Sequence, residues 1–208
     1  MDMNLLAMDS PLMRFFARVG DIILLNLIFV VTSLPMVTIG ASLSALYAVA
    51  MKLVRGEEPS VWKEYLKAWK GNFKTATLCW LIMTAAAGLL VLDFRLAGAF
   101  AGAAYTAVRL VLAMALGIWM LIFLYLFPYI ARFENTVFHS IKNALLLNGA
   151  HLPSSLMMLG ISLGFLVLTF YTSETFVIGT VLWTFAGFAL MAWVQSFLLC
   201  RVFANYEK

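Results

Sequence analysis

The stretch IILLNLIFVVTSLPMVTIGASLSALYAVAM, residues 22–51, decides how many times this chain crosses a membrane. Its 30 residues carry no charge. As a single helix they would be about 45 Å long, which exceeds a hydrocarbon core of about 30 Å. Pro35 lies near the centre, and a proline inside a helix removes a backbone hydrogen bond and clashes with the preceding turn. The stretch therefore predicts two spans, over 15–34 and 40–54, with a turn between them.

Four further runs without charge follow this stretch, over 75–92, 110–131, 152–173 and 175–200. Of the 208 residues, 64% are hydrophobic and 12% are charged, whereas globular proteins use about 25% charged residues. Each run reaches or nearly reaches the roughly 20 apolar residues that cross hydrocarbon as a helix, and backbone groups in lipid need partners within their own segment. We therefore predict an all-α integral membrane protein with six transmembrane helices, over about 15–34, 40–54, 75–93, 106–131, 152–173 and 175–200.

The distribution of Lys and Arg predicts the orientation. With six spans and both termini inside, 12 of the 14 basic residues lie on the inner side and only Arg95 and Arg109 lie outside. A single long first span would move Arg14 and Arg18 outside and change the ratio to 10 to 4. Because cytoplasmic loops favour Lys and Arg, we predict three hairpins with cytoplasmic N and C termini.

Two cytoplasmic amphipathic helices, over about 60–73 and 135–149, are expected to join the hairpins. The first has an apolar stripe at helical spacing, made of Trp62, Tyr65, Leu66, Trp69 and Phe73, and a basic remainder made of Lys63, Lys67, Lys70 and Lys74. Such a helix lies at the membrane interface with its rings at headgroup level and its lysines towards anionic lipid. A docking surface for a cytoplasmic partner is the alternative, and the two roles can coexist.

Seven residues are the candidates for partner contact. They are Trp62, Lys63, Lys67, Trp69 and Lys70 on the first amphipathic helix, with Arg132 and Glu134 at the end of the fourth span. An ion pair between Arg132 and Glu134 could anchor the following helix, which is the structural interpretation of these two residues.

Polar groups inside the membrane are the second set of candidates, because such groups mark solute pathways. Near the middle of the bilayer these groups are uncharged, and Asn26, Thr32 and Gln195 are interpreted either as interhelical hydrogen-bonding partners or as a pathway. A charged set of zero net charge is expected at the outer ends of the spans, where it would pair or form a vestibule for a polar solute: Asp93, Arg95, Arg109 and Glu174. The lack of buried ionisable groups argues against a proton-coupled transporter.

Small residues predict where helices approach closely. Gly40, Ser44 and Ala48 stand four apart on the second span, and Gly160 and Gly164 form a GxxxG pattern on the fifth. Such stripes let helix backbones come together in lipid. Packing within one chain is the default interpretation, and packing between two copies is the alternative.

Catalytic motifs are missing from the sequence, which has no Gly-rich phosphate loop, HExxH or GxSxG. His139 and His151 could hold a metal together with Glu134, but solvated linker histidines are the favoured interpretation. We therefore expect no enzymatic activity, no cofactor, no metal and no nucleic-acid partner.

Several short motifs carry a family resemblance: SLPMVTIGAS leading into ALYAV, KLVRGEE, NFK, and ARFEN followed by KNALLL and HLP. The chain resembles the YesL-like family of bacterial multi-pass membrane proteins, a domain of unknown function, over nearly its whole length. That family is commonly found with genes for sugar uptake and polysaccharide breakdown, including ABC-type importers. The resemblance implies an accessory role in carbohydrate import at a bacterial cytoplasmic membrane, and it supplies no catalytic residues.

Two functional hypotheses follow. The first is an accessory or scaffold component that contacts membrane lipids and ABC-type sugar importer subunits, with homo-oligomer formation left open. The second is a stand-alone small-solute or lipid transporter or channel that uses the polar residues. The EAA…G coupling-loop pattern typical of importer permeases is not found, so the chain is not expected to be the permease itself.

Overall fold

The computed structural model describes residues 11–99 and 102–206, and these residues form helices joined by short connections, with no strand among them. The helices are α1 (Pro11–Ser33), α2 (Ile39–Val54), α3 (Val61–Leu96), α4 (Gly102–Arg132), α5 (Val137–Ala150), α6 (Leu152–Phe170), α7 (Ser173–Leu182) and α8 (Phe188–Phe203). Six helical stretches of the described residues are long and apolar enough to cross a membrane. The predicted class, an all-α multi-pass membrane protein, is confirmed at this level.

The predicted break at Pro35 is present. α1 ends at Ser33, a 3-10 turn covers Met36–Thr38, and α2 begins at Ile39. The hydroxyl of Thr38 donates hydrogen bonds to the carbonyl oxygens of Thr32, at 2.6 Å, and Pro35, at 2.7 Å, which satisfies acceptors left open where α1 ends. The charge-free run is therefore two span-length helices rather than one kinked helix.

α2 is the central helix of the fold. Of the residues in its most apolar 18-residue stretch, 61% are buried, whereas the corresponding share in the other candidate spans is 11–22%. α2 packs against α1, α3, α4 and α8. A Cβ added at Gly40 would lie 2.6 Å from the Cβ of Trp80 and would collide with the carbonyl oxygen of Ala76. The small residue is thus required for the close approach of α2 to α3, as predicted for packing within one chain.

The GxxxG pattern on α6 behaves differently. A Cβ added at Gly160 or Gly164 would meet no described atom within 4 Å. The default expectation of packing within one chain is therefore wrong for this pair, because α6 turns these glycines away from its neighbours.

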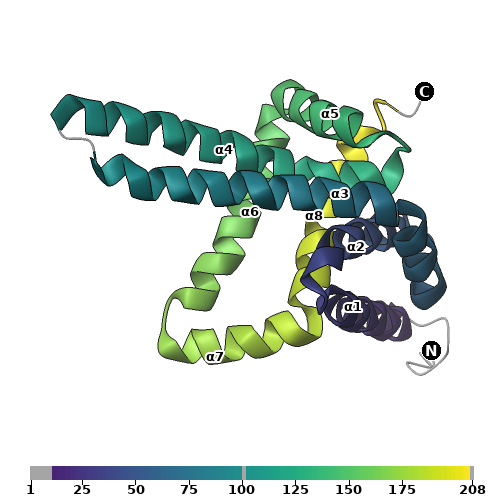
Figure 1. The fold of residues 1–208 in the computed structure, drawn as a ribbon. Helices are drawn as coiled ribbons and strands as arrows, with labels where there is room; N and C mark the ends of the chain where they lie inside the picture. The colour runs from purple at the N-terminus through teal and green to yellow at the C-terminus, as the bar shows by residue number, and fades with distance from the viewer. Residues whose placement is uncertain (1–10, 100–101, 207–208) are drawn as a thin grey trace.

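α3 differs from the prediction, which placed an amphipathic helix over 60–73 and a separate span over 75–93. The structure has one helix of 36 residues, Val61–Leu96. The boundary was predicted from the change in charge content, and a change in charge does not interrupt backbone hydrogen bonding. Figure 1 shows the first turns of α3 beside α1 and α2, and the remainder extending away beside α4.

The sixth predicted span, over 175–200, is a continuous helical run with an irregular middle. α7 is followed directly by a π-helical segment, Trp183–Gly187, and then by α8. In Figure 1, α7 runs at a steep angle to α8, as expected where a π segment changes the direction of a helix. α7 packs mainly against α6 and the π segment.

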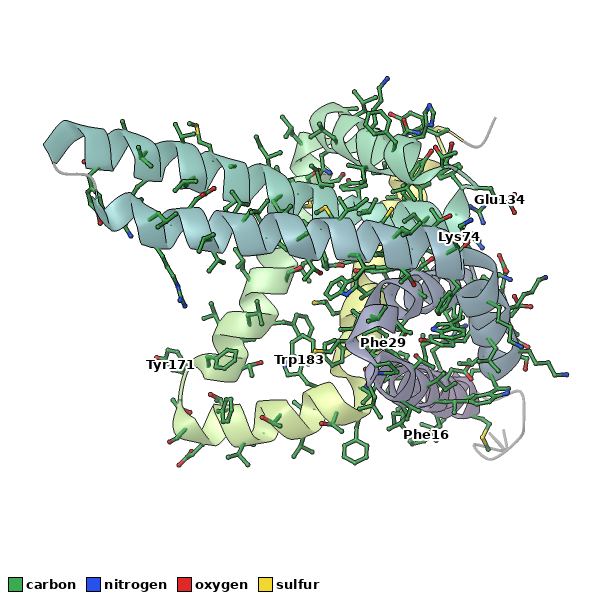
Figure 2. The ribbon with its side chains drawn as sticks, viewed as in Figure 1. Phe16, Phe29, Lys74, Glu134, Tyr171 and Trp183 are labelled. Atoms are coloured by element: carbon green, nitrogen blue, oxygen red, sulfur yellow. The ribbon has the colours of Figure 1, made fainter. Side chains whose placement is uncertain are left out.

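Several helix ends and turns lie at two opposite sides of the molecule in the view of Figure 1. In Figure 1 the start of α1, the α4–α5 connection and the end of α8 lie on the right, whereas the tip of the α3–α4 pair and the α6–α7 turn lie on the left. Figure 2 places Lys74 and Glu134 on the first side and Tyr171 on the second.

Candidate functional site

One face of the first turns of α3 is packed against the rest of the protein. Tyr65 is fully buried, while Leu66, Trp69 and Phe73 are half-buried against the core. The Trp69 and Phe73 rings meet edge to face with centroids 4.8 Å apart. Four of the five residues of the apolar stripe expected at headgroup level therefore contribute to the protein core, because α1 and α2 lie directly beside them, whereas Trp62 is exposed.

The other face of the same turns is exposed and basic: it carries Lys63, Lys67 and Lys70. Trp62 is 55% exposed next to them. The two ion pairs found among the described residues are Lys52–Glu64 and Arg55–Glu57, both at 2.7 Å. Neither pair uses one of the three lysines, so the exposed face keeps a positive charge.

A polar cluster fixes this helix to its neighbours. The hydroxyls of Tyr65 and Thr32 share a hydrogen bond of 2.6 Å, and the Ser42 hydroxyl donates to that of Thr32 at 3.0 Å. Further along, the Asn72 amide donates to the Ser44 hydroxyl at 2.9 Å. These bonds join α1, α2 and α3, so Thr32 holds three helices together.

Asn26 is fully buried and binds the backbone of the π segment. Its amide nitrogen donates to the carbonyl oxygens of Trp183, at 3.0 Å, and Thr184, at 2.7 Å. Its amide oxygen accepts a hydrogen bond from the backbone N–H of Ala189 at 3.0 Å. A π segment shifts the register of helical hydrogen bonding, and Asn26 bonds to backbone groups within this segment and just after it.

Gln195, on α8, is bonded to two other helices, α2 and α6. Its amide oxygen accepts a hydrogen bond from the Tyr47 hydroxyl at 2.5 Å, and its amide nitrogen donates to the Ser162 hydroxyl at 2.8 Å. The residue is 1% exposed. Asn26, Thr32 and Gln195 thus lie in three clusters, and no hydrogen bond described between them connects one cluster to another.

We predict that Tyr47→Phe lowers stability moderately. The substitution removes the only side-chain donor to the Gln195 amide oxygen in the described structure, and interhelical hydrogen bonds in membranes average about 0.6 kcal/mol with a maximum near 1.7. Thermal unfolding in detergent should show a lower midpoint for this variant. Tyr171→Phe is the control because Tyr171 is 78% exposed, and equal midpoints for the two variants would contradict the prediction.

The four charged residues expected to pair at the outer ends are all exposed: Asp93, Arg95, Arg109 and Glu174. Among the described residues, no ion pair joins any two of them. Arg109 instead donates to the Tyr105 hydroxyl one turn earlier, at 2.5 Å, and lies 5.1 Å from the centre of its ring. In Figure 1 the tip of the α3–α4 pair is separate from the start of α7, so Glu174 is remote from the other three and the expected pairing is not found.

Arg132 and Glu134 are exposed where α4 ends. Glu134 lines a hollow of about 640 Å³ together with Lys74, Asn135 and His139. The predicted Arg132–Glu134 ion pair stays a prediction. Within the described ranges, no group of three His, Cys, Asp or Glu side chains is placed to hold a metal ion.

These features define a multi-pass helical membrane protein whose most distinctive surface is a basic helix face held in place by buried polar clusters. Residues 22–94 match the sequence model of the family described as "Protein of unknown function, DUF624", which bears out the resemblance to the YesL-like family over this range. The matched range contains both the Pro35 break and the basic face of α3. No curated protein and no solved structure gives a match to the chain.

Proposed function

We propose that this protein is a non-enzymatic accessory or scaffold component of an ABC-type carbohydrate uptake system in the bacterial cytoplasmic membrane. Its six spans form three hairpins with both termini in the cytoplasm, and its basic α3 face contacts cytoplasmic parts of the importer. The family resemblance suggests the uptake system, and the count of Lys and Arg on each side supports the orientation.

The observation that carries this proposal is the division of the first turns of α3 into a fixed face and an exposed face. The fixed face is buried through Tyr65, whereas Trp62 and the three lysines project outward. A surface that is already rigid loses little conformational entropy on binding. Exposed tryptophan is enriched among the residues that dominate binding energy, and a basic patch selects an acidic partner. Anionic lipid can contact the same face when no partner is bound.

A stand-alone transporter or channel has less support. Asn26, Thr32 and Gln195 each use their side-chain groups in hydrogen bonds between helices. Five hollows are found among the described residues, and the side chains of Asn26, Thr32 and Gln195 line none of these five. A polar solute would therefore have to break bonds that hold the helices together.

Reversing the charge of the basic face tests the proposal. The triple substitution Lys63→Glu, Lys67→Glu and Lys70→Glu should reduce co-purification of importer subunits from native membranes by at least about tenfold, since opposite charges across an interface become like charges. The matched control replaces the same three lysines by arginine and should keep the partners.

Membrane insertion must be checked in both triple variants, because changing three basic residues can alter topology. Labelling of a cysteine placed near either terminus reports the orientation. Correct insertion with unchanged partner recovery in the glutamate variant would overturn the proposal. The transporter hypothesis instead predicts that the isolated protein carries flux in proteoliposomes and that the charge reversal leaves this flux intact.

A further inference from the structure

A cavity of about 300 Å³ lies between α6, α7 and the start of α8. Its walls are mainly apolar: they include Phe165, Leu168, Ile178, Leu182, Trp183 and Leu190. Both helical stretches that enclose it, Leu152–Phe170 and Ser173–Phe203, are candidate membrane spans. The cavity therefore lies in the part of the chain that is expected to be surrounded by lipid.

The polar side chains of this cavity already have partners. The Thr169 hydroxyl donates to the carbonyl oxygen of Phe165 at 2.8 Å and accepts from the Trp183 indole N–H at 2.9 Å. The Thr175 hydroxyl donates to the carbonyl oxygen of Thr172 at 3.0 Å and accepts from its backbone N–H at 2.8 Å. A polar ligand would lose its bonds to water without replacement, at a cost of at least about 1 kcal/mol per group. Apolar cavities of this kind instead take apolar occupants.

The walls of the cavity are shaped by close approaches at two glycines. A Cβ at Gly179 would lie 2.8 Å from the methyl carbon of Thr169, and a Cβ at Gly187 would lie 2.8 Å from the Trp183 ring. The Trp183 ring also packs 4.8 Å from the Phe188 ring, and its backbone carbonyl is held by Asn26. The cavity is thus formed before any ligand binds.

The two ends of the cavity differ in polarity. One end reaches Thr175, next to the α6–α7 turn, where Tyr171 is 78% exposed and Glu174 is exposed. The other end reaches the apolar Leu190 on α8. One turn of a helix about 10 Å wide and 5.4 Å high occupies roughly 420 Å³, so a helix of a second copy is too wide for the cavity. A hydrocarbon chain is much narrower, and the cavity encloses a segment of one, with the rest of the chain in the surrounding lipid.

We propose that this cavity binds one acyl chain of a phospholipid from the surrounding membrane. The chain lies along α6 and α7 against the Trp183 ring. The headgroup lies at the polar turn that contains Tyr171 and Glu174. This lipid is held specifically because the cavity is half-enclosed and preformed, in contrast to lipids that touch the smooth faces of the spans.

Native mass spectrometry of the full chain after mild detergent extraction tests the proposal. The native protein should retain one phospholipid, and Ala186→Phe, which fills the cavity, should reduce the retained fraction at least about fivefold. Val177→Phe is the matched control, because Val177 lies on α7, is 64% exposed and does not line the cavity. It should retain lipid as the native protein does.

A second measurement covers the case in which Ala186→Phe fails to fold. Phospholipids brominated along the chain should quench Trp183 fluorescence strongly in a variant whose other five tryptophans are replaced by phenylalanine, and adding Leu190→Phe, which narrows the cavity without a second fluorophore, should weaken the quenching. Equal lipid retention in Ala186→Phe and Val177→Phe, or weak quenching of Trp183, would overturn the proposal. So would retention of free fatty acid alone, or a dimer that Ala186→Phe dissociates without any bound lipid.

Discussion

Gly40→Leu is expected to prevent stable assembly of the helices, with a loss of about 3 kcal/mol or more. Overpacking a core costs about 1–3 kcal/mol and more where the neighbour cannot move. Here the atoms in the way are the backbone carbonyl of Ala76 and the Cβ of Trp80, which cannot rotate aside as a flexible side chain can. The substitution should separate α2 from α3 and so disturb the centre of the fold.

Gly160→Leu provides the matched control for this prediction. Both glycines lie in membrane-spanning helices, but a Cβ at Gly160 meets no described atom within 4 Å. Size-exclusion chromatography and thermal unfolding in detergent should show aggregation or a much lower midpoint for Gly40→Leu and native behaviour for Gly160→Leu. The same behaviour in both variants would mean that α2 and α3 are not closely packed at Gly40.

Asn26→Leu is the second substitution with a large expected effect. It removes two hydrogen bonds to the π segment and one to the start of α8, and so leaves the carbonyls of Trp183 and Thr184 and the N–H of Ala189 without this partner. At roughly 0.6–1.7 kcal/mol for each interhelical bond in a membrane protein, the total loss is about 2–5 kcal/mol. We expect α7 to lose its fixed angle to α8.

Thr180→Val is the control for Asn26→Leu, because the Thr180 hydroxyl bonds only to the carbonyl of Phe176 in its own helix. Unfolding midpoints in a denaturing detergent titration should fall for Asn26→Leu and stay near the native value for Thr180→Val. Trp183 emission should shift at the same time, since its backbone anchor is lost. An unchanged midpoint together with unchanged emission would contradict the account of Asn26.

The spans could be predicted from the sequence because lipid imposes simple requirements. Long runs without charge have to be helical, and Pro35 had to end the first of two helices because the run is too long for one span. The structure has its break there, between Ser33 and Ile39. The same reasoning predicted the exposed lysines of α3, since charged groups at helical spacing do not enter a core.

The remaining features depend on contacts between distant residues. Tyr65 belongs to an apolar stripe that suits lipid and protein equally well, and only the position of α1 and α2 buries it. The π segment is bound by Asn26, 157 residues earlier in the chain from Trp183, and no local pattern in WTFAG indicates this. The charged residues at the outer ends of the spans are predicted to lie at the same level in the membrane. That shared level does not determine which helix ends lie next to one another in the fold.

The docking role of the basic α3 face can be tested most directly by photo-crosslinking in native membranes. A photoreactive amino acid in place of Lys67 would report what touches the face, and the same amino acid in place of Val177, which is 64% exposed on α7, would report the lipid background. We predict that position 67 crosslinks to a protein partner, identified by mass spectrometry as an importer subunit, and that position 177 does not. Crosslinks from position 67 to lipid alone would contradict the docking role and leave this face as a membrane anchor.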